Sequence, residues 1–304
     1  MARSALTDQA TPLNVQPVAA MPHMGDPVFS DEFAGSSLNG AKWQPWYPDV
    51  PFWNTTTPGG HKTNSNEPQG YDETGITFVD DADGKRVMRF TMHESNHAVP
   101  ELAYTSGMVC SYPSFVSKYG YFEARLKVPN AWGSWPAFWR MPADFVWPPE
   151  EDIFENWGRD TFNGQSSSAV HFPNQVPSRT AHHQFAGDTG GVWRTFGELR
   201  EPGRMRTYFD GTLVADWEID PAYERDMYLL CNLAGDKDNH AGVANSAPFS
   251  MDVDYIRAWS LDGSDSEEPT PVEDSLIRNN AGETLTPHIL RNGAPVAVTP
   301  KRRE

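Results

Sequence analysis

Apolar and polar residues alternate with a period of two in several segments of this chain. In residues 121–128 and again in residues 249–255, every second side chain is apolar. Side chains of a β-strand point to opposite faces in turn, so each segment predicts a strand with one buried face. Val253 and Tyr255 are expected on the same buried face. Long helical periodicity is absent, and the chain is predicted to be all-β, an antiparallel β-sandwich of the concanavalin-like jelly-roll kind with a cleft on its concave sheet.

Turn signals and composition divide the chain. Asp210-Gly211 between two strand-like runs predicts a two-residue hairpin. The 304 residues can hold one large β domain with tails. An acidic stretch rich in Ser, Pro and Thr follows Trp259 and is typical of a linker. The predicted parts are an N-terminal leader (1–26), a catalytic domain (27–260), an acidic linker (261–274) and a C-terminal tail (275–304).

Charge and cysteine content exclude several functions. The formal net charge of −17 argues against a nucleic-acid partner. No apolar run reaches the ~18 residues of a membrane span, and the first 25 residues lack the apolar core of a secretory signal. The two cysteines, Cys110 and Cys231, lie in apolar runs and are expected to be buried free thiols, with a disulfide as the alternative. No cysteine or histidine spacing indicates zinc or redox chemistry.

Three carboxylates follow one another closely in a strand-like segment. Glu150, Asp152 and Glu155 form the pattern E-x-D-x-x-E. In a regular strand Glu155 would face away from the other two, but one extra residue near Ile153-Phe154 would return it to their face. A retaining glycosidase needs two carboxyl groups about 5–5.5 Å apart. Acidic clusters are more often solvated surfaces, so this pattern alone does not establish catalysis.

Several further segments resemble one known family in order along the chain. They are Ser30-Asp31-Glu32-Phe33, Asn66-Glu67 with Gln69 and Tyr71, Tyr119–Arg125, Gly133–Trp139, the acidic motif, Tyr208–Gly211 and Val253–Arg257. Over residues 27–260 the chain resembles glycoside hydrolase family 16, the laminarinase and agarase group of retaining endo-glycanases.

The resemblance implies a mechanism and a substrate class. Glu150 would be the nucleophile, Glu155 the acid and base, and Asp152 the residue that tunes and orients the pair. The bulged motif favours β-1,3-glucan, with a β-galactan or an actinobacterial cell-envelope glycan, cleaved by a phage tail depolymerase, as an alternative. A non-catalytic glycan-binding or structural virion protein on the same fold is a second alternative. It would be expected to lose Glu150 or Glu155, and both are present.

Three positions depart from the family pattern. Glu151 stands where an aliphatic residue is usual and should face the core between the sheets, where a carboxylate is costly unless paired or protonated. An aliphatic residue there is expected to be tolerated or stabilising. Leu199-Arg200 replaces a frequent Glu-Trp pair, and Tyr121 replaces a frequent arginine.

Aromatic residues indicate a sugar-binding surface, since flat rings cover the C–H face of a sugar. Trp43, Trp139 and Trp259 are expected in the core, whereas Trp46 and Trp53 are expected to line the glycan site. The residues chosen as substrate-binding are Trp135, His171, Asn66, Trp132 and Trp157. His171 is included because the resemblance implies a position near the nucleophile.

The resemblance also implies accessory features. Relatives often hold a structural calcium on the convex face, and Glu32 and Asp254 match two of its positions, although two carboxylates do not make a calcium site. No cofactor is required by the expected mechanism. A polysaccharide acting as substrate indicates an extracellular or virion-associated protein, and the tail (275–304) is predicted to attach it to a phage tail or another large assembly.

Overall fold

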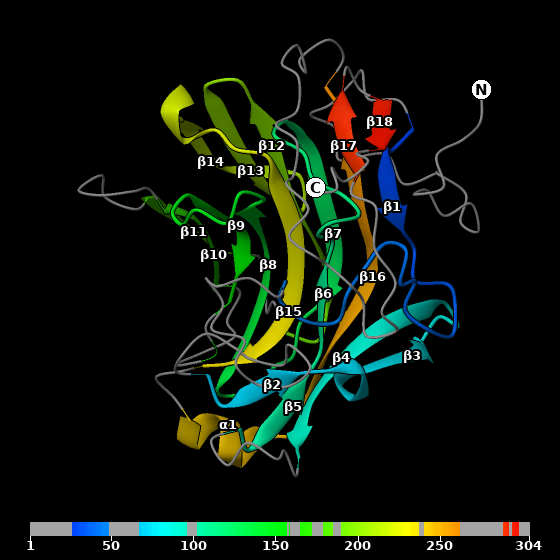
Figure 1. Cartoon of the computed structure of the whole chain (residues 1–304). Helices are drawn as coiled ribbons and strands as arrows, with labels where there is room; N and C mark the ends of the chain where they lie inside the picture. Colours follow the sequence, from blue (N-terminus) through cyan, green and yellow to red (C-terminus); the bar gives the residue numbers. More distant parts are fainter. Residues whose placement is uncertain are drawn as a thin grey trace.

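The structure is a computed structural model that describes residues 26–48, 67–95, 102–156, 158, 165–171, 179–184, 190–236, 240–261, 288–291 and 294–297. Within these ranges the protein is a sandwich of two β-sheets (Figure 1). Neighbouring strands run antiparallel, apart from the parallel pair β2 (Gln69–Tyr71) and β5 (Tyr104–Ser106). The predicted antiparallel β-sandwich is confirmed.

The larger sheet has ten strands in the order β14-β13-β12-β7-β16-β4-β5-β2, with β1 paired to β16 and β3 paired to β4. Its further strands are β1 (Phe29–Asp31), β3 (Ile76–Asp80), β4 (Arg86–Glu94), β7 (Gly120–Lys127), β12 (Trp193–Glu201), β13 (Arg204–Phe209), β14 (Thr212–Glu218) and β16 (Phe249–Trp259).

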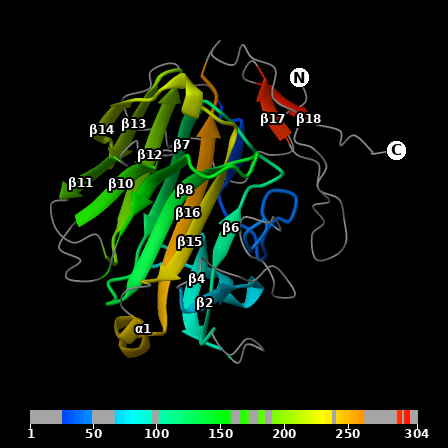
Figure 2. The same cartoon turned by 60° about the vertical axis from the view of Figure 1, so that its left-hand side comes forward.

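The smaller sheet has six strands in the order β11-β10-β9-β8-β15-β6. They are β6 (Met108–Cys110), β8 (Ser134–Pro142), β9 (Glu150–Glu155), β10 (Gln165–His171), β11 (Arg179–Gln184) and β15 (Met227–Gly235). Strands β8 and β15 are bowed, and their concave side faces away from the larger sheet (Figures 1 and 2). This face of the six-stranded sheet is called the concave face below.

The main core fills the space between the two sheets. Phe122, Ala124 and Leu126 of β7 are fully buried in it, as their alternation predicts. Across the layer, Phe154 of β9 stacks on Phe196 of β12 with ring centroids 3.8 Å apart. A separate cluster that includes Trp139, Met141 and Leu230 covers the other side of the six-stranded sheet.

The Asp210-Gly211 hairpin is confirmed. Phe209 pairs with Thr212, and both turn residues have positive φ, 45° for Asp210 and 76° for Gly211. Glycine adopts this conformation without strain, and aspartate tolerates it better than most residues do. The turn chemistry therefore sets the register of β13 and β14.

The predicted face of Tyr255 is wrong. Val253 pairs with Leu126, but Tyr255 pairs with the next residue of β7, Arg125, so Asp254 is an extra residue in β16. This bulge turns Tyr255 away from the core, and its hydroxyl donates to buried Glu123 at 2.7 Å. A strict period of two cannot reveal such an insertion.

The cysteines are both buried and free. Cys231 pairs with Val109 and Cys110 pairs with Leu230 on the neighbouring strands β15 and β6. The two thiols therefore point to opposite faces of the six-stranded sheet, Cys231 to the main core and Cys110 to the other side. The expected pair of buried free thiols is confirmed.

Few other elements occur in the described ranges. They are the helix α1 (His240–Ser246), the 3-10 turns η2 (Glu73–Gly75) and η3 (Pro221–Tyr223), and a separate two-stranded sheet of β17 (His288–Arg291) and β18 (Ala294–Ala297). No helix in the described part of the chain is long and apolar enough to cross a membrane. The leader up to residue 25 and the linker beyond Leu261 lie outside the described residues, so the domain limits and the attachment role of the tail stay predictions.

Candidate active site

Strand β9 carries the acidic motif and contains the expected bulge. On one side, Phe138 pairs with Phe154, and the next residue of β8, Trp139, pairs with Asp152. Ile153 is thus an extra residue, and the register with β10 shifts at the same place. The bulge changes the side-chain alternation, so Asp152 and Glu155 can share a face although they are three residues apart.

The side chains of β9 that contact the larger sheet show which of its side chains face the concave side. Glu151 contacts β12 through Arg200, and Phe154 stacks in the main core, so both face the larger sheet. By alternation and the bulge, Glu150, Asp152 and Glu155 face the concave side. The predicted shared face of the three carboxylates is confirmed.

Asp152 lies at the centre of the group and is almost completely buried. Its Oδ2 is 2.9 Å from Nε2 of His171, which ends β10 directly opposite Glu150. Burial, followed by the charges of Glu155 and Glu150, holds the pKa of Asp152 well above its usual range. A raised pKa favours the protonated form of the carboxyl group, and that form can donate a hydrogen bond to a neighbouring carboxylate.

Each outer carboxylate receives a hydrogen bond from an indole N–H group. Trp147 donates to Oε2 of Glu150 at 2.5 Å, and Trp135 donates to Oε1 of Glu155 at 3.0 Å. Trp147 is exposed on the loop before β9, and its part in the group was not anticipated from the sequence, although it directly precedes the motif. Trp135 was expected as a sugar platform, and the structure gives it a direct contact with a carboxylate as well.

The two outer glutamates differ in environment. Burial and the negative charge of Glu150 raise the pKa of Glu155 to about 7, while the bond from Trp135 acts in the opposite direction. At neutral pH a large fraction of Glu155 is therefore protonated. A carboxyl group with a raised pKa beside a second carboxylate is typical of the general acid in a two-carboxylate site.

Beside the carboxylates, polar groups form a chain along the concave face. Trp139 donates through Nε1 to Asn232 at 2.7 Å, and Asn232 donates to the hydroxyl of Tyr71 at 2.9 Å. Gln69 contacts the same hydroxyl and donates to Glu67 at 2.9 Å. Trp139 belongs to one resemblance segment, and Glu67, Gln69 and Tyr71 belong to another. The connection was not anticipated, because residues 71 and 232 are brought together only by the fold.

The other aromatic predictions have mixed outcomes. Trp43 is buried in the main core and Trp139 is buried on the concave side, whereas Trp46, expected to line the glycan site, is only 7% exposed. Trp132 is 45% exposed on the loop before β8 and remains a candidate for sugar contact. Trp259 packs with Tyr121 outside the main core. Asn66, Trp53 and Trp157 lie outside the described residues.

Glu151 is paired, which is one of the two conditions under which its burial was expected to be tolerated. The carboxylate faces the core, as predicted, and it is paired with two buried arginines: Arg140 of the neighbouring strand at 2.7 Å and Arg200 of the opposite sheet at 3.0 Å. Arg200 is itself one of the departures from the family pattern. Two departures 49 residues apart are thus partners in one ion pair.

This buried ionic cluster, defined as Arg140, Glu151, Glu198 and Arg200, has one further acid. Glu198 of β12 accepts from Arg140 at 2.9 Å and has no exposed side-chain surface. Burial and the neighbouring charge of Glu151 raise the pKa of Glu198 to about 8, whereas the two arginines keep the pKa of Glu151 low. A neutral Glu198 leaves Glu151 as the main anion between two cations.

The expected calcium ligands are engaged with cations of the chain. Arg257 donates two bonds of 2.7 Å to Glu32, and Lys85 and Arg125 form ion pairs with Asp254. A calcium ion would have to replace these side chains, so calcium stays a prediction without support from this geometry.

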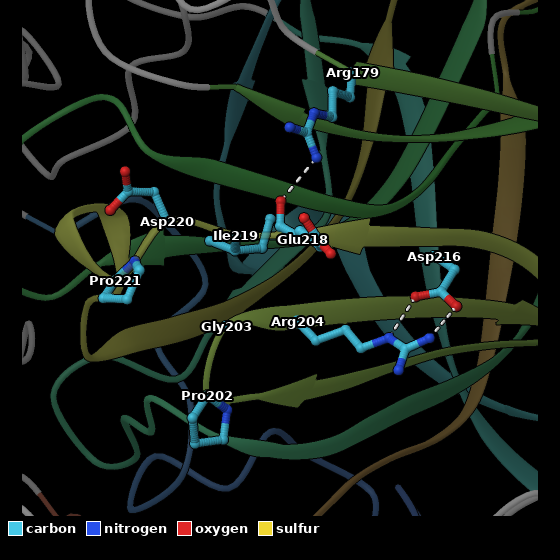
Figure 3. Close-up of a pocket in the computed structure, with 9 residues that line it drawn as sticks. All are labelled: Arg179, Pro202, Gly203, Arg204, Asp216, Glu218, Ile219, Asp220 and Pro221. Atoms are coloured by element: carbon cyan, nitrogen blue, oxygen red, sulfur yellow. Dashed lines mark hydrogen bonds and ion pairs between the residues drawn. The ribbon is translucent and has the colours of Figure 1, made fainter.

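A hollow of about 1000 Å³ lies away from the acidic motif, at the edge formed by β11, β13 and β14 (Figure 3). It is lined by Arg179, Pro202, Gly203, Arg204, Asp216, Glu218, Ile219, Asp220 and Pro221. Arg204 makes two bonds to Asp216, and Arg179 donates to the carbonyl of Glu218 at 2.7 Å. Its arginines are already bound and its lining has no aromatic ring, so it does not resemble a sugar site.

The geometry of β9 agrees with comparisons to known proteins. The family model described as glycosyl hydrolases family 16 matches residues 70–230, a segment that contains the acidic strand. The chain belongs to glycosyl hydrolases family 16. The resemblance seen in the sequence motifs is therefore confirmed at the level of the family.

Individual relatives match the chain over part of their own length. Endo-1,3-1,4-beta-glycanase ExsH of Rhizobium meliloti (strain 1021) is 32% identical over 251 residues, which cover 77% of this chain and 52% of ExsH. Glucan endo-1,3-beta-glucosidase A1 of Niallia circulans is 26% identical over 262 residues, or 76% of this chain and 37% of that protein. The chain spans about half the length of ExsH and less of the second relative.

A solved structure supports the fold. LamAcat from Zobellia galactanivorans superposes with a TM-score of 0.63 at 23% sequence identity, covering 78% of this chain and 98% of the other. The shared architecture is the jelly-roll sandwich described above.

Proposed function

We propose that this protein is a retaining endo-β-glycanase that acts on β-1,3-glucan. The proposal rests on the bulge in β9, since it turns Glu150, Asp152 and Glu155 to one face. A sheet without the bulge would separate the two outer glutamates onto opposite faces and could not support double displacement. Family membership and the printed activities of the relatives agree with this reaction.

Each carboxylate has a distinct part in the proposed mechanism. Glu150, partly exposed and hydrogen-bonded to Trp147, attacks the anomeric carbon and forms a glycosyl-enzyme. Glu155, with its raised pKa, protonates the leaving oxygen and then removes a proton from the attacking water. Asp152 lies beside the nucleophile with its pKa raised by burial, and His171 orients it through the contact between Nε2 and Oδ2.

The substrate is the less constrained part of the proposal. ExsH is named for activity on mixed 1,3-1,4 linkages and the Niallia circulans enzyme for 1,3-glucan, so both substrates belong in one test. We expect reducing ends to form from laminarin faster than from lichenan, agarose or mycobacterial arabinogalactan. Faster cleavage of agarose or arabinogalactan would contradict the glucan assignment, and binding of laminarin without cleavage would favour a glycan-binding protein.

Retention of configuration is a direct consequence of double displacement. The first reducing sugar released from a β-glucan should be the β-anomer, because two successive inversions restore the original configuration. Proton NMR during the first minutes of hydrolysis, before mutarotation, measures the anomer. Initial release of the α-anomer would show a single displacement and would exclude Glu150 as a nucleophile.

The pH profile should report Glu155. This residue must be protonated to act as the acid, so kcat/KM is expected to decline as pH rises through about 7. The Trp135 bond lowers the pKa of Glu155, so Trp135→Phe should move this decline to higher pH. Trp132→Phe is the matched control: it replaces an exposed indole on the preceding loop by a phenyl ring and should leave the position of the decline unchanged. An unmoved decline in Trp135→Phe would assign the titration to another group.

A further inference from the structure

Three potential metal ligands converge on the concave face. Glu150, Asp152 and His171 each offer one donor atom, and all three atoms lie within 4.8 Å of one another. Glu150 and His171 are paired across β9 and β10, and Asp152 is the next residue on the same face of β9. The backbone register therefore holds the three donors together.

The donor set fits zinc better than calcium or magnesium. Zinc takes imidazole nitrogen and carboxylate oxygen at about 2.0–2.2 Å, often with three protein ligands and a water molecule. Tetrahedral bonds of that length separate two donor atoms by about 3.4 Å. The His171 Nε2–Asp152 Oδ2 distance of 2.9 Å is close to this value and widens with a small rotation of either side chain. Calcium requires six or more oxygens, which this group does not supply.

The surroundings provide access and support. The side chain of His171 is 34% exposed, whereas that of Asp152 is 4% exposed. An ion would therefore enter from the concave face past His171 and reach Asp152, which is almost inaccessible to solvent. Trp147 donates to Oε2 of Glu150 and can orient that carboxylate while its other oxygen binds the metal. Two carboxylates and one imidazole would balance the charge of a dication.

We propose that Glu150, Asp152 and His171 form a binding site for a zinc-type divalent cation, and that the bound ion inhibits the enzyme reversibly. The ion would be bonded to the Glu150 oxygen that attacks the sugar, so binding of the metal and binding of the glycan would exclude each other. The inhibitory part rests on the proposed function, whereas the binding part does not.

Calorimetry with zinc chloride tests the binding part on the full chain. Wild type should show a site that is lost, or weakened at least tenfold, in His171→Gln and in Asp152→Asn. His93→Gln is the matched control, because His93 lies on β4 of the larger sheet and is not one of the three donors. Its Nδ1 contacts the carbonyl oxygen of the neighbouring Glu94. It should bind zinc as wild type does, and magnesium should not compete. Melting temperatures of all variants exclude unfolding as the cause.

Glu155→Gln separates the two parts of the proposal. Glu155 is not among the three donors, so this variant should lose turnover and still bind zinc. In the wild type, zinc should raise the apparent KM for soluble glucan and leave kcat unchanged. Equal zinc affinity of wild type and His171→Gln would contradict the proposed zinc site. Noncompetitive inhibition would contradict competition between zinc and glycan. Loss of zinc binding in His171→Gln, in a protein that hydrolyses no glycan, would keep the site and reject the proposed function.

Discussion

Glu150→Gln is expected to lower turnover by about 10⁴-fold while glycan affinity changes only a few-fold. The amide keeps the shape of the side chain and can still contact Trp147, but it cannot form the bond to the anomeric carbon. Glu151→Gln is the adjacent control for register, because that side chain faces the opposite side of β9. Inactivation by Glu151→Gln with a nearly silent Glu150→Gln would contradict the assigned faces.

Chemical rescue by azide tests the roles of Glu150 and Glu155 through the configuration of the product. In Glu150→Ala, azide can enter the space left by the carboxylate and attack an activated aryl β-glucoside from the α side, giving an α-glycosyl azide. In Glu155→Ala the glycosyl-enzyme still forms, and azide attacks it from the β side, giving a β-glycosyl azide. Product configuration therefore assigns the two roles independently of rate, and exchanged configurations would exchange the roles of Glu150 and Glu155.

Glu151→Ile is expected to destabilise the protein by about 3–5 kcal/mol, contrary to the expectation from sequence. Removal of this carboxylate takes away the anion that Arg140 and Arg200 share, and neither arginine has more than 2% side-chain exposure. Of the ion pairs between described residues, Arg140 then keeps only that with Glu198, and Arg200 keeps only the longer contact of 3.4 Å with Glu224. For a domain of this size the loss corresponds to a fall in Tm of about 10 °C. Thermal unfolding followed by circular dichroism measures it.

The matched experiment removes the whole buried ionic cluster. Arg140→Leu, Glu151→Ile, Glu198→Leu and Arg200→Trp, combined in one variant, replace the four side chains of the cluster by apolar ones. Glu224 loses its contact with Arg200 but keeps hydrogen bonds from Tyr119 and Gly203. Because buried ion pairs often contribute little compared with good apolar packing, this variant should regain most of the stability lost in Glu151→Ile. A Tm of Glu151→Ile equal to that of wild type would contradict the assigned pairing energy. A Tm of the combined variant below that of Glu151→Ile would contradict it as well.

Local patterns determined much of the fold and the composition of the site. Alternation in residues 121–128 predicted a half-buried strand, and Asp210-Gly211 predicted the hairpin, because both depend on neighbours along the chain. The shared face of Glu150, Asp152 and Glu155 was also predictable, since a single inserted residue reverses the alternation of the strand.

Tertiary structure alone decided which distant groups meet. Glu151 and Arg200 each look unfavourable in isolation, and only the packing of two sheets makes them partners. The bulge at Asp254 likewise turned Tyr255 from the core to Glu123, and the fold joined Tyr71 to Asn232. Sequence periodicity describes which face a side chain occupies, but it carries no information about what the opposite layer places there. The charge of a buried residue is therefore interpretable only when its neighbour across the core is known.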